Sequence, residues 1–413
     1  MKKIILAILL FPLVYCAQLT RIPDSNFEQQ LINLGYDDVL DGGVITIDIS
    51  TVQQLNISNS NISDISGIED FIALESLNCM NNYLTSLPIT ENTNLETLNC
   101  FGNYLNSMDL IQNPMLKHLN CGNNILLSLD VSHNFYLEEL YCSNNNLFTL
   151  DLLSNLNLEI FHCNDNVITD LNLVSNVALI NLQCEGNLLV DLDLNSNIYL
   201  ESISCASNQL VDLDLFLLEN LNNINCSSNA IKTLDFANNN QLEILNCSIN
   251  ELKKIDISVN TNLRGLDCSS NGLRCLNVKN GNNINFLFFD ASSNKDLQCL
   301  EVDDELAAAT NWSSNVDPGV VFSTFCANPC SESLTALLVT ESEFSIFPNP
   351  ANDVINISIK HSLAFKAELL DCTGRLVLTT SSNQIDVSDL AFGSYYLRLI
   401  IGNQIHVSKI IKN

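Results

Sequence analysis

The middle of the chain repeats one pattern of apolar and polar positions every 21 residues. The unit reads L-x-x-L-x-C-x-x-N-x-L-x-x-L-D-L-x-x-N-x-x and covers residues 52–300. Apolar and polar residues alternate around each cysteine, as in Leu98-Asn99-Cys100, which predicts a strand with one buried face. Segments such as Leu129-Asp130-Val131 alternate again and predict a second short strand. A fixed period of this kind indicates a solenoid whose turns contact only their neighbours.

Cysteine and asparagine keep the strictest register within this unit. Ten cysteines recur without interruption, and an asparagine follows each of them by three positions; the cysteines are Cys79, Cys100, Cys121, Cys142, Cys163, Cys184, Cys205, Cys226, Cys247 and Cys268. A second asparagine column begins at Asn92 and ends at Asn260. Short amide side chains at turns bond backbone groups of their own turn and of the next one. We expect a mainly β fold, with two parallel sheets joined by turns.

The regular cysteines, which we call the cysteine ladder, take the place of an inward-facing leucine. We expect them to pack as small apolar side chains with raised pKa values. Neighbouring Cβ atoms on in-register parallel strands lie roughly 4.8 Å apart with parallel vectors, which does not suit a disulfide. Outside the ladder, Cys299 with Cys326 is the preferred disulfide because it would pin a C-terminal cap to the last turn. Cys275 with Cys299 is the alternative.

The frame of the unit resembles the leucine-rich repeat, in the cysteine-bearing 21-residue variant of internalin-like bacterial surface proteins. The last turn departs from the frame through a two-residue insertion, and Ala291 takes the cysteine position there. Residues 18–51 predict an N-terminal cap with an amphipathic helix that opens on a capping box, Ser25-x-x-Glu28. Residues 301–330, with the only tryptophan, predict a C-terminal cap. Both caps are expected where a repeat array meets solvent.

The two ends of the chain indicate export. Residues 1–17 have a positive start and an apolar stretch too short to span a bilayer, which is typical of a signal peptide. Residues 331–343 are expected to be a linker. Residues 344–413 alternate in short runs and predict a small Ig-like antiparallel β-sandwich. An ordinary Ig-like module is one interpretation of this segment.

The same segment also resembles the type A C-terminal sorting domain of the type IX secretion system. The resemblance rests on Phe347-Pro348-Asn349-Pro350, on the D-x-x-G-R element from Asp371 to Arg375, and on the L-x-x-G-x-Y element from Leu390 to Tyr395. It implies that the type IX machinery recognises residues 344–413 and that the protein is secreted or held on the outer-membrane cell surface.

Charge narrows the range of partners. The formal net charge is −30, and residues 22–231 hold 27 acidic residues against one basic residue, Lys117. Nucleic acids and anionic membrane surfaces need basic patches, so neither is an expected partner. After the signal peptide, no segment is long and apolar enough to predict a transmembrane helix. We expect a monomer.

Catalytic chemistry finds no support in the sequence. The five histidines share no metal-ligand spacing, and no nucleophile, phosphate-loop, dinucleotide or zincin motif is present. We therefore expect no enzyme activity and no cofactor, with calcium as the one exception considered below.

Binding has better candidates. In leucine-rich repeats the outward positions of the concave strand usually carry recognition. Here the residues that flank the ladder cysteines include the candidates Phe101, Tyr141, His162, Gln183 and Glu185. Amide and aromatic side chains suit a protein or glycan ligand, so an adhesin-like role is the main hypothesis. A structural surface or matrix component without a specific ligand is the alternative.

One acidic group could hold a cation. The second strand carries Asp170, Asp191, Asp193, Asp212 and Asp214, and residues i and i+2 of a strand share a face. Like charges at strand spacing repel, and Ca²⁺ takes several carboxylates. We treat a calcium site as a hypothesis beside the simpler interpretation, a solvated acidic face.

Overall fold

The computed structural model describes residues 18–326, 344–359, 365–371, 375–401 and 404–412. The predicted signal peptide (1–17) and linker (331–343) lie outside the described residues, as do the last residues of the predicted C-terminal cap. The described chain falls into two compact units: Met1–Leu192 with Ser202–Gln209, and Asp193–Glu201 with Leu210–Asn413.

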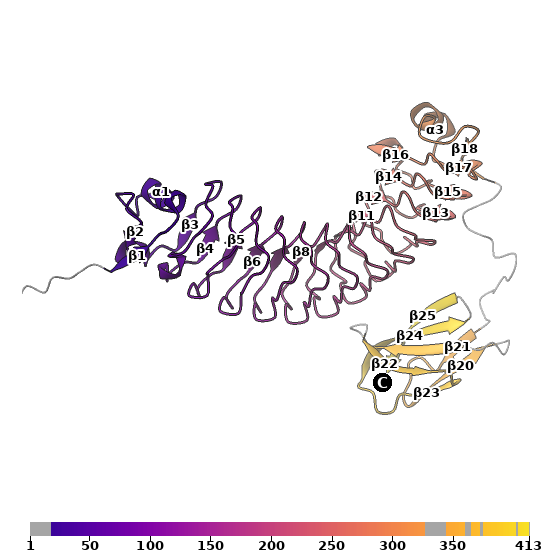
Figure 1. Ribbon diagram of the computed structural model, residues 1–413. Helices are drawn as coiled ribbons and strands as arrows, with labels where there is room; N and C mark the ends of the chain where they lie inside the picture. Colours follow the sequence, from indigo (N-terminus) through magenta and orange to yellow (C-terminus); the bar gives the residue numbers. More distant parts are fainter. Residues whose placement is uncertain (1–17, 327–343, 360–364, 372–374, 402–403, 413) are drawn as a thin grey trace, which may run out of the picture. The chain divides into compact units, whose positions relative to one another are not determined.

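The repeats form a parallel β-solenoid in which each 21-residue unit is one turn (Figure 1). One strand from each turn joins a 12-stranded parallel sheet, in the order β3 (Gln54–Asn56), β4 (Ser76–Asn78), β5 (Thr97–Asn99), β6 (His118–Asn120), β7 (Glu139–Tyr141), β8 (Ile160–His162), β9 (Asn181–Gln183), β10 (Ser202–Ser204), β11 (Asn223–Asn225), β12 (Ile244–Asn246), β14 (Gly265–Asp267) and β16 (Phe288–Asp290). The central residue of each strand is buried. The predicted mainly β solenoid is therefore confirmed.

The cysteine ladder lies in the core, as predicted. All ten side chains are buried thiols. Burial raises the pKa of Cys79, Cys121, Cys184 and Cys226 to about 12, and it raises the pKa of Cys100 well above its ordinary value. The low polarity around each sulfur disfavours the thiolate. These cysteines therefore pack as apolar side chains.

The first asparagine column joins neighbouring turns through buried hydrogen bonds. Asn124 Nδ2 donates to the carbonyl oxygens of Cys100 and Cys121, both at 3.1 Å, and its Oδ1 accepts from the Leu105 backbone N–H at 2.9 Å. The same triad of bonds recurs at Asn145. The amide thus satisfies backbone groups that the turn would otherwise leave unpaired in the core.

The second side of the solenoid differs from the expectation of a full second sheet. Among the described residues, strands pair there only at β13 (Lys254–Asp256), β15 (Cys275–Asn277), β17 (Cys299–Glu301) and β18 (Val321–Ser323), which form a four-stranded sheet. Along this side the second asparagine column provides cross-turn bonds, as where Asn134 Nδ2 donates to Leu110 and Asn113 carbonyls.

The N-terminal cap consists of β1 (Leu19–Arg21), α1 (Ser25–Leu34), β2 (Gly43–Ile45) and α2 (Thr46–Ile49), and η1 (Ile68–Asp70) follows in the first turn. The predicted capping box is wrong in detail. Asp24, not Ser25, is the N-cap, and its Oδ1 accepts the N–H groups of Asn26 and Phe27. Glu28 is buried instead, with Oε1 accepting the backbone N–H groups of residues 41–43. The helix begins one residue earlier than the predicted capping box requires, because Asp24 takes the N-cap position and Ser25 becomes the first helical residue.

The C-terminal cap contains η2 (Asn283–Asn285) and α3 (Glu305–Trp312). Cys299 and Cys326 form a disulfide bond with Cα atoms 5.9 Å apart, which is the pairing preferred from the sequence. Cys275 is also disulfide-bonded, so the alternative pairing with Cys299 is wrong. The bond joins β17 to the segment that follows β18.

The C-terminal domain is an antiparallel sandwich. One sheet contains β19 (Phe344–Phe347), β20 (Val354–Ile359) and β23 (Gln384–Asp386), and the other contains β22 (Leu376–Thr380), β21 (Phe365–Leu370), β24 (Gly393–Ile401) and β25 (Gln404–Lys412). Alternate residues of both sheets, among them Ile355, Leu369 and Leu397, form its core.

Candidate ligand-binding site

Alternate side chains of the long sheet face outward. In most turns they stand three positions before the ladder cysteine, one before it and one after it, while the residues between them are buried. From the sequence, only the last two columns were predicted to carry recognition. The first column includes His118 and Glu139. We call the outward side chains of strands β3 to β10 the sheet face.

Three of the predicted ligand-binding residues are direct neighbours on this face. Tyr141, His162 and Gln183 are in register on β7, β8 and β9. The rings of Tyr141 and His162 meet edge to face, with centroids 4.9 Å apart and planes at 90°. This arrangement is favourable for aromatic rings and holds both side chains in a defined orientation.

The first column extends the group. The Tyr141 hydroxyl donates to Glu139 Oε2 at 3.2 Å, and His118 Nδ1 lies 3.5 Å from the same oxygen. Burial and the Glu139 carboxylate together raise the pKa of Tyr141. The four side chains His118, Glu139, Tyr141 and His162, which we call the Tyr–His cluster, therefore form a continuous chain of contacts over three turns.

Polar atoms around His162 are buried but unused. His162 Nε2, Asn164 Oδ1 and Asn181 Oδ1 have no hydrogen-bond partner among the described residues. Burial lowers the pKa of His162, and the Asn181 side chain with the charges of Glu139 and Glu185 opposes this only in part. The imidazole is therefore neutral at physiological pH. These three atoms are buried, so the groups of this region that a ligand can reach are the partly exposed side chains of Tyr141, Glu139 and His118.

Glu185 and Gln183 are held by side chains of the adjacent turns. Ser204 Oγ donates to Glu185 Oε2 at 2.7 Å. Asn164 Nδ2 donates to Gln183 Oε1 at 3.2 Å and to Glu185 Oε1 at 3.4 Å. The network fixes an amide and a carboxylate next to the Tyr–His cluster. Together these groups offer donors, acceptors and two aromatic edges.

Phe101 lies apart from this group. It is two turns away from Tyr141 along the sheet, and its ring covers Gly122, where a Cβ would lie 3.2 Å from Phe101 Cδ2. A bulkier side chain at Gly122 would displace the ring. Phe101 is therefore a separate aromatic position, not a member of the Tyr–His cluster.

The acidic candidates are distributed over both compact units. Asp170 and Asp191 belong to the first unit, whereas Asp193, Asp212 and Asp214 belong to the second. Most of these carboxylates already accept nearby backbone N–H groups, as Asp191 Oδ1 does from Leu192 and Asp214 Oδ1 from Phe216. Within the described ranges, no group of three or more His, Cys, Asp or Glu side chains could hold a metal ion. A calcium site at these positions stays a prediction.

The motifs of the C-terminal segment each have a structural role. Arg375 Nε donates to Asp371 Oδ2 at 3.2 Å, which closes the D-x-x-G-R element. The Tyr395 hydroxyl donates to the Ala391 carbonyl at 2.9 Å within the L-x-x-G-x-Y element. Asn349 of the F-P-N-P element exchanges two hydrogen bonds with the backbone of β25. The motif residues thus fix the turns and the last strand of the sandwich.

Comparison with known proteins agrees with this division of the chain. Residues 345–413 match the family described as the secretion system C-terminal sorting domain. No curated protein matches the sequence. The functional domain of InlJ from Listeria monocytogenes, which is described as including a cysteine ladder, is 22% identical with a TM-score of 0.57 over 96% of this chain and 99% of that one. A leucine-rich-repeat protein from Leptospira interrogans is 23% identical with a TM-score of 0.53 over 62% of this chain and 74% of that one.

The chain therefore has the leucine-rich-repeat solenoid fold and carries the predicted type IX sorting domain. That domain marks it as a secreted or cell-surface protein. None of the helices in the described parts of the chain has the length and apolarity that a membrane crossing requires.

Proposed function

We propose that the protein is an exported, adhesin-like binding protein that recognises a protein or glycan ligand through the sheet face. The Tyr–His cluster supports this proposal most directly. It places the Tyr141 and His162 rings edge to face on the sheet face, beside the Glu139 carboxylate that accepts from the Tyr141 hydroxyl. Surfaces that bind protein or sugar combine aromatic contact area with oriented hydrogen-bonding groups. We propose further that the protein acts as a monomer and without enzymatic activity.

The charges around the Tyr–His cluster favour a neutral or basic ligand. Glu139 and Glu185 border the cluster, and the nearest basic side chain in sequence, Lys117, is paired with Glu96 at 2.9 Å. A ligand that offers hydroxyl, amide or ammonium donors suits this border, whereas a polyanion is repelled. Neutral glycans and basic protein surfaces are therefore the first ligands to test.

A glycan and protein array probed with the purified full-length chain tests the proposal. We expect saturable binding that Tyr141→Ala or His162→Ala weakens by about 2 kcal/mol, or roughly thirtyfold, as is usual for the central residues of an interface. Tyr136→Ala is a matched control, because Tyr136 is an exposed tyrosine outside the outward columns. Unchanged binding by both cluster variants would reject the site. Uniform absence of binding by the wild type would favour the structural surface component.

The sorting domain has its own partner. We propose that the type IX machinery recognises residues 344–413 as the export signal. Asp371→Ala and Arg375→Ala remove the ion pair of the D-x-x-G-R element. In a host with this machinery, we expect both variants to reach the medium or cell surface less efficiently than Gln384→Ala. Equal surface levels of all three variants would contradict a role for this element.

A further inference from the structure

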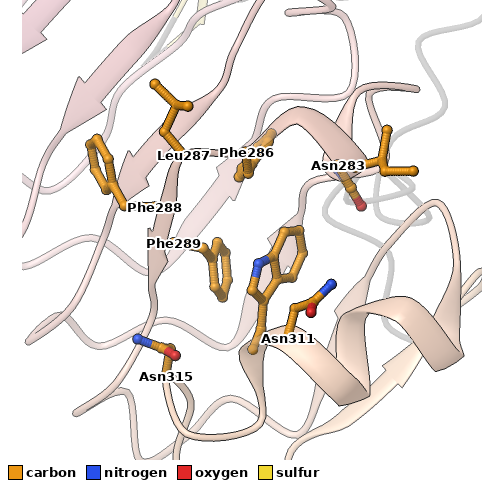
Figure 2. A pocket seen from close by; sticks show the side chains of 9 residues that line it. Asn283, Phe286, Leu287, Phe288, Phe289, Asn311 and Asn315 are labelled. Atoms are coloured by element: carbon orange, nitrogen blue, oxygen red, sulfur yellow. The ribbon is translucent and has the colours of Figure 1, made fainter.

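A cavity of about 450 Å³ lies at the C-terminal cap, where the 21-residue period is broken (Figure 2). Two elements line it: the inserted segment that leads into β16, and the end of helix α3. The lining residues are Asn283, Ile284, Phe286, Leu287, Phe288, Phe289, Asn311, Trp312 and Asn315. The volume is at the lower end of the roughly 300–1,000 Å³ that small-ligand pockets span.

Aromatic rings form the floor of the cavity. The Phe289 ring stacks on Trp312 with centroids 4.3 Å apart and planes at 22°, and the Phe286 ring lies 5.3 Å from Trp312. Trp312 is 8% exposed and Phe289 is 4% exposed, so the packing holds both rings in place. Phe286 is half-buried and borders the open side. Phe286 is therefore the ring of this group that a ligand can contact, and the buried pair holds it from behind.

Amide side chains supply the polar groups. Asn311 and Asn315, which are labelled in Figure 2, line the cavity together with Trp312. The Asn311 side chain makes no hydrogen bond to any described residue, and Asn315 uses only its Oδ1, which accepts from Ser314 Oγ at 2.9 Å. Asn283 is different, because its amide already bonds Val278, Asn280 and Asp303. Asn311 and Asn315 therefore retain groups that can serve a ligand.

The inserted segment also exposes apolar side chains beside the cavity. Ile284 is 91% exposed and Leu287 is 68% exposed, which is unusual for residues of this size in a strongly acidic protein. The Phe288 ring lies over Gly265, where a Cβ would approach the ring to 2.5 Å. Glycine at this position leaves the space that Phe288 occupies. The wall of the cavity therefore depends on a matched pair of residues from two turns.

We propose that this cavity binds one neutral pyranose residue of a glycan. The lining contains no charged side chain, so it favours an uncharged ligand. The partly exposed Phe286 ring matches the apolar C–H face of a sugar ring, and the amides of Asn311 and Asn315 match hydroxyl groups, which both donate and accept. A purely apolar ligand would leave these amides without partners. The cavity shares no residue with the sheet face, so the two proposals stand or fall separately.

The only tryptophan of the chain makes the proposal directly measurable. The purified full-length chain is titrated with the methyl glycosides of glucose, galactose, mannose and N-acetylglucosamine, and binding is followed by calorimetry and by Trp312 fluorescence. We expect saturable, millimolar binding of at least one glycoside with a shift of the emission maximum. Asn311→Ala should weaken this binding about fivefold to tenfold, the effect of one lost hydrogen bond.

The controls separate the cavity from the rest of the surface. Thr310→Ala is matched to Asn311→Ala, because Thr310 is the preceding residue of α3, is exposed and does not line the cavity. It should bind as the wild type does, and so should Tyr141→Ala. Gly265→Ala should weaken binding by displacing Phe288. The proposal is overturned if no glycoside binds at tens of millimolar, or if Asn311→Ala and Thr310→Ala bind equally well.

Discussion

Alkaline pH should unfold the solenoid through the cysteine ladder. Burial raises the pKa of Cys121 and Cys184 to about 12, from an ordinary value of 9.0. The folded state therefore keeps protons that the unfolded chain releases. A group whose pKa is raised on folding contributes stability below its unfolded pKa, and this contribution is lost as pH rises towards the folded value. The expected window for each of these thiols is thus pH 9 to 12.

The size of the effect follows from the linkage relation. One pKa unit corresponds to about 1.4 kcal/mol, and a thiol of this kind loses roughly 1.4 kcal/mol of stabilisation between pH 8 and pH 10. Cys79 and Cys226 have the same raised value, so four thiols together lose roughly 5 kcal/mol. That is a large fraction of the roughly 5–15 kcal/mol by which domains are stable. The other ladder thiols with raised pKa values act in the same direction.

Denaturant unfolding at pH 8 and pH 10, in a reducing buffer and followed by circular dichroism, measures the loss. The variant with Cys121→Ala and Cys184→Ala should lose roughly 3 kcal/mol less than the wild type over this interval, because two linked protons are gone. Leu119→Ala is the control: Leu119 is buried in the same core, and the substitution weakens packing but keeps every thiol. Tyrosine and lysine titrations cancel in the comparison. Equal losses in all three proteins would refute the linkage.

Three further results are expected. Asn124→Ala should destabilise the solenoid by about 3 kcal/mol because it removes four buried hydrogen bonds, whereas Asn157→Ala, at an exposed site, should cost under about 0.5 kcal/mol in the same denaturant assay. Cys326→Ala should lower stability by about 3 kcal/mol, since the bond to Cys299 spans 27 residues, and a reductant should then have a smaller effect than on the wild type. The calcium hypothesis requires a rise in melting temperature with added Ca²⁺ that Asp191→Ser with Asp212→Ser abolishes; an unchanged wild-type transition would reject it.

The repeat explains why the fold could be predicted from the sequence. Each turn is specified by positions that meet only their equivalents one turn away, so the period alone determines the pairing partners. The burial of the ladder and its raised pKa values followed from the inward position of residues such as Cys100. Local competition between nearby side chains was harder to predict. Asp24 and Ser25 both favour an N-cap, and the sequence offered no means to choose between them.

The candidate site was predictable to the extent that it follows the period. Tyr141, His162 and Gln183 have the same place in successive units, and parallel pairing brings equal places together. Glu139 was missed because its column was not considered, although strand alternation places it on the same face as Tyr141. That column is the signal that could have identified it. Whether Glu139 and Tyr141 touch depends on their side-chain rotamers, which a sequence pattern does not specify.

The cap cavity shows where the reasoning from periodicity stops. The inserted residues shift the segment before β16 out of register, so no column predicts where Phe286 or Ile284 will lie. Within the regular turns, the ladder cysteines and both asparagine columns are committed to the core and its backbone bonds. Residues that can vary to bind a ligand are therefore restricted to the outward columns and to turns that depart from the 21-residue repeat. Local departures from a fold's own rules are where function is to be sought. By that criterion, the broken turn at residues 280–289 is as strong a candidate as the Tyr–His cluster.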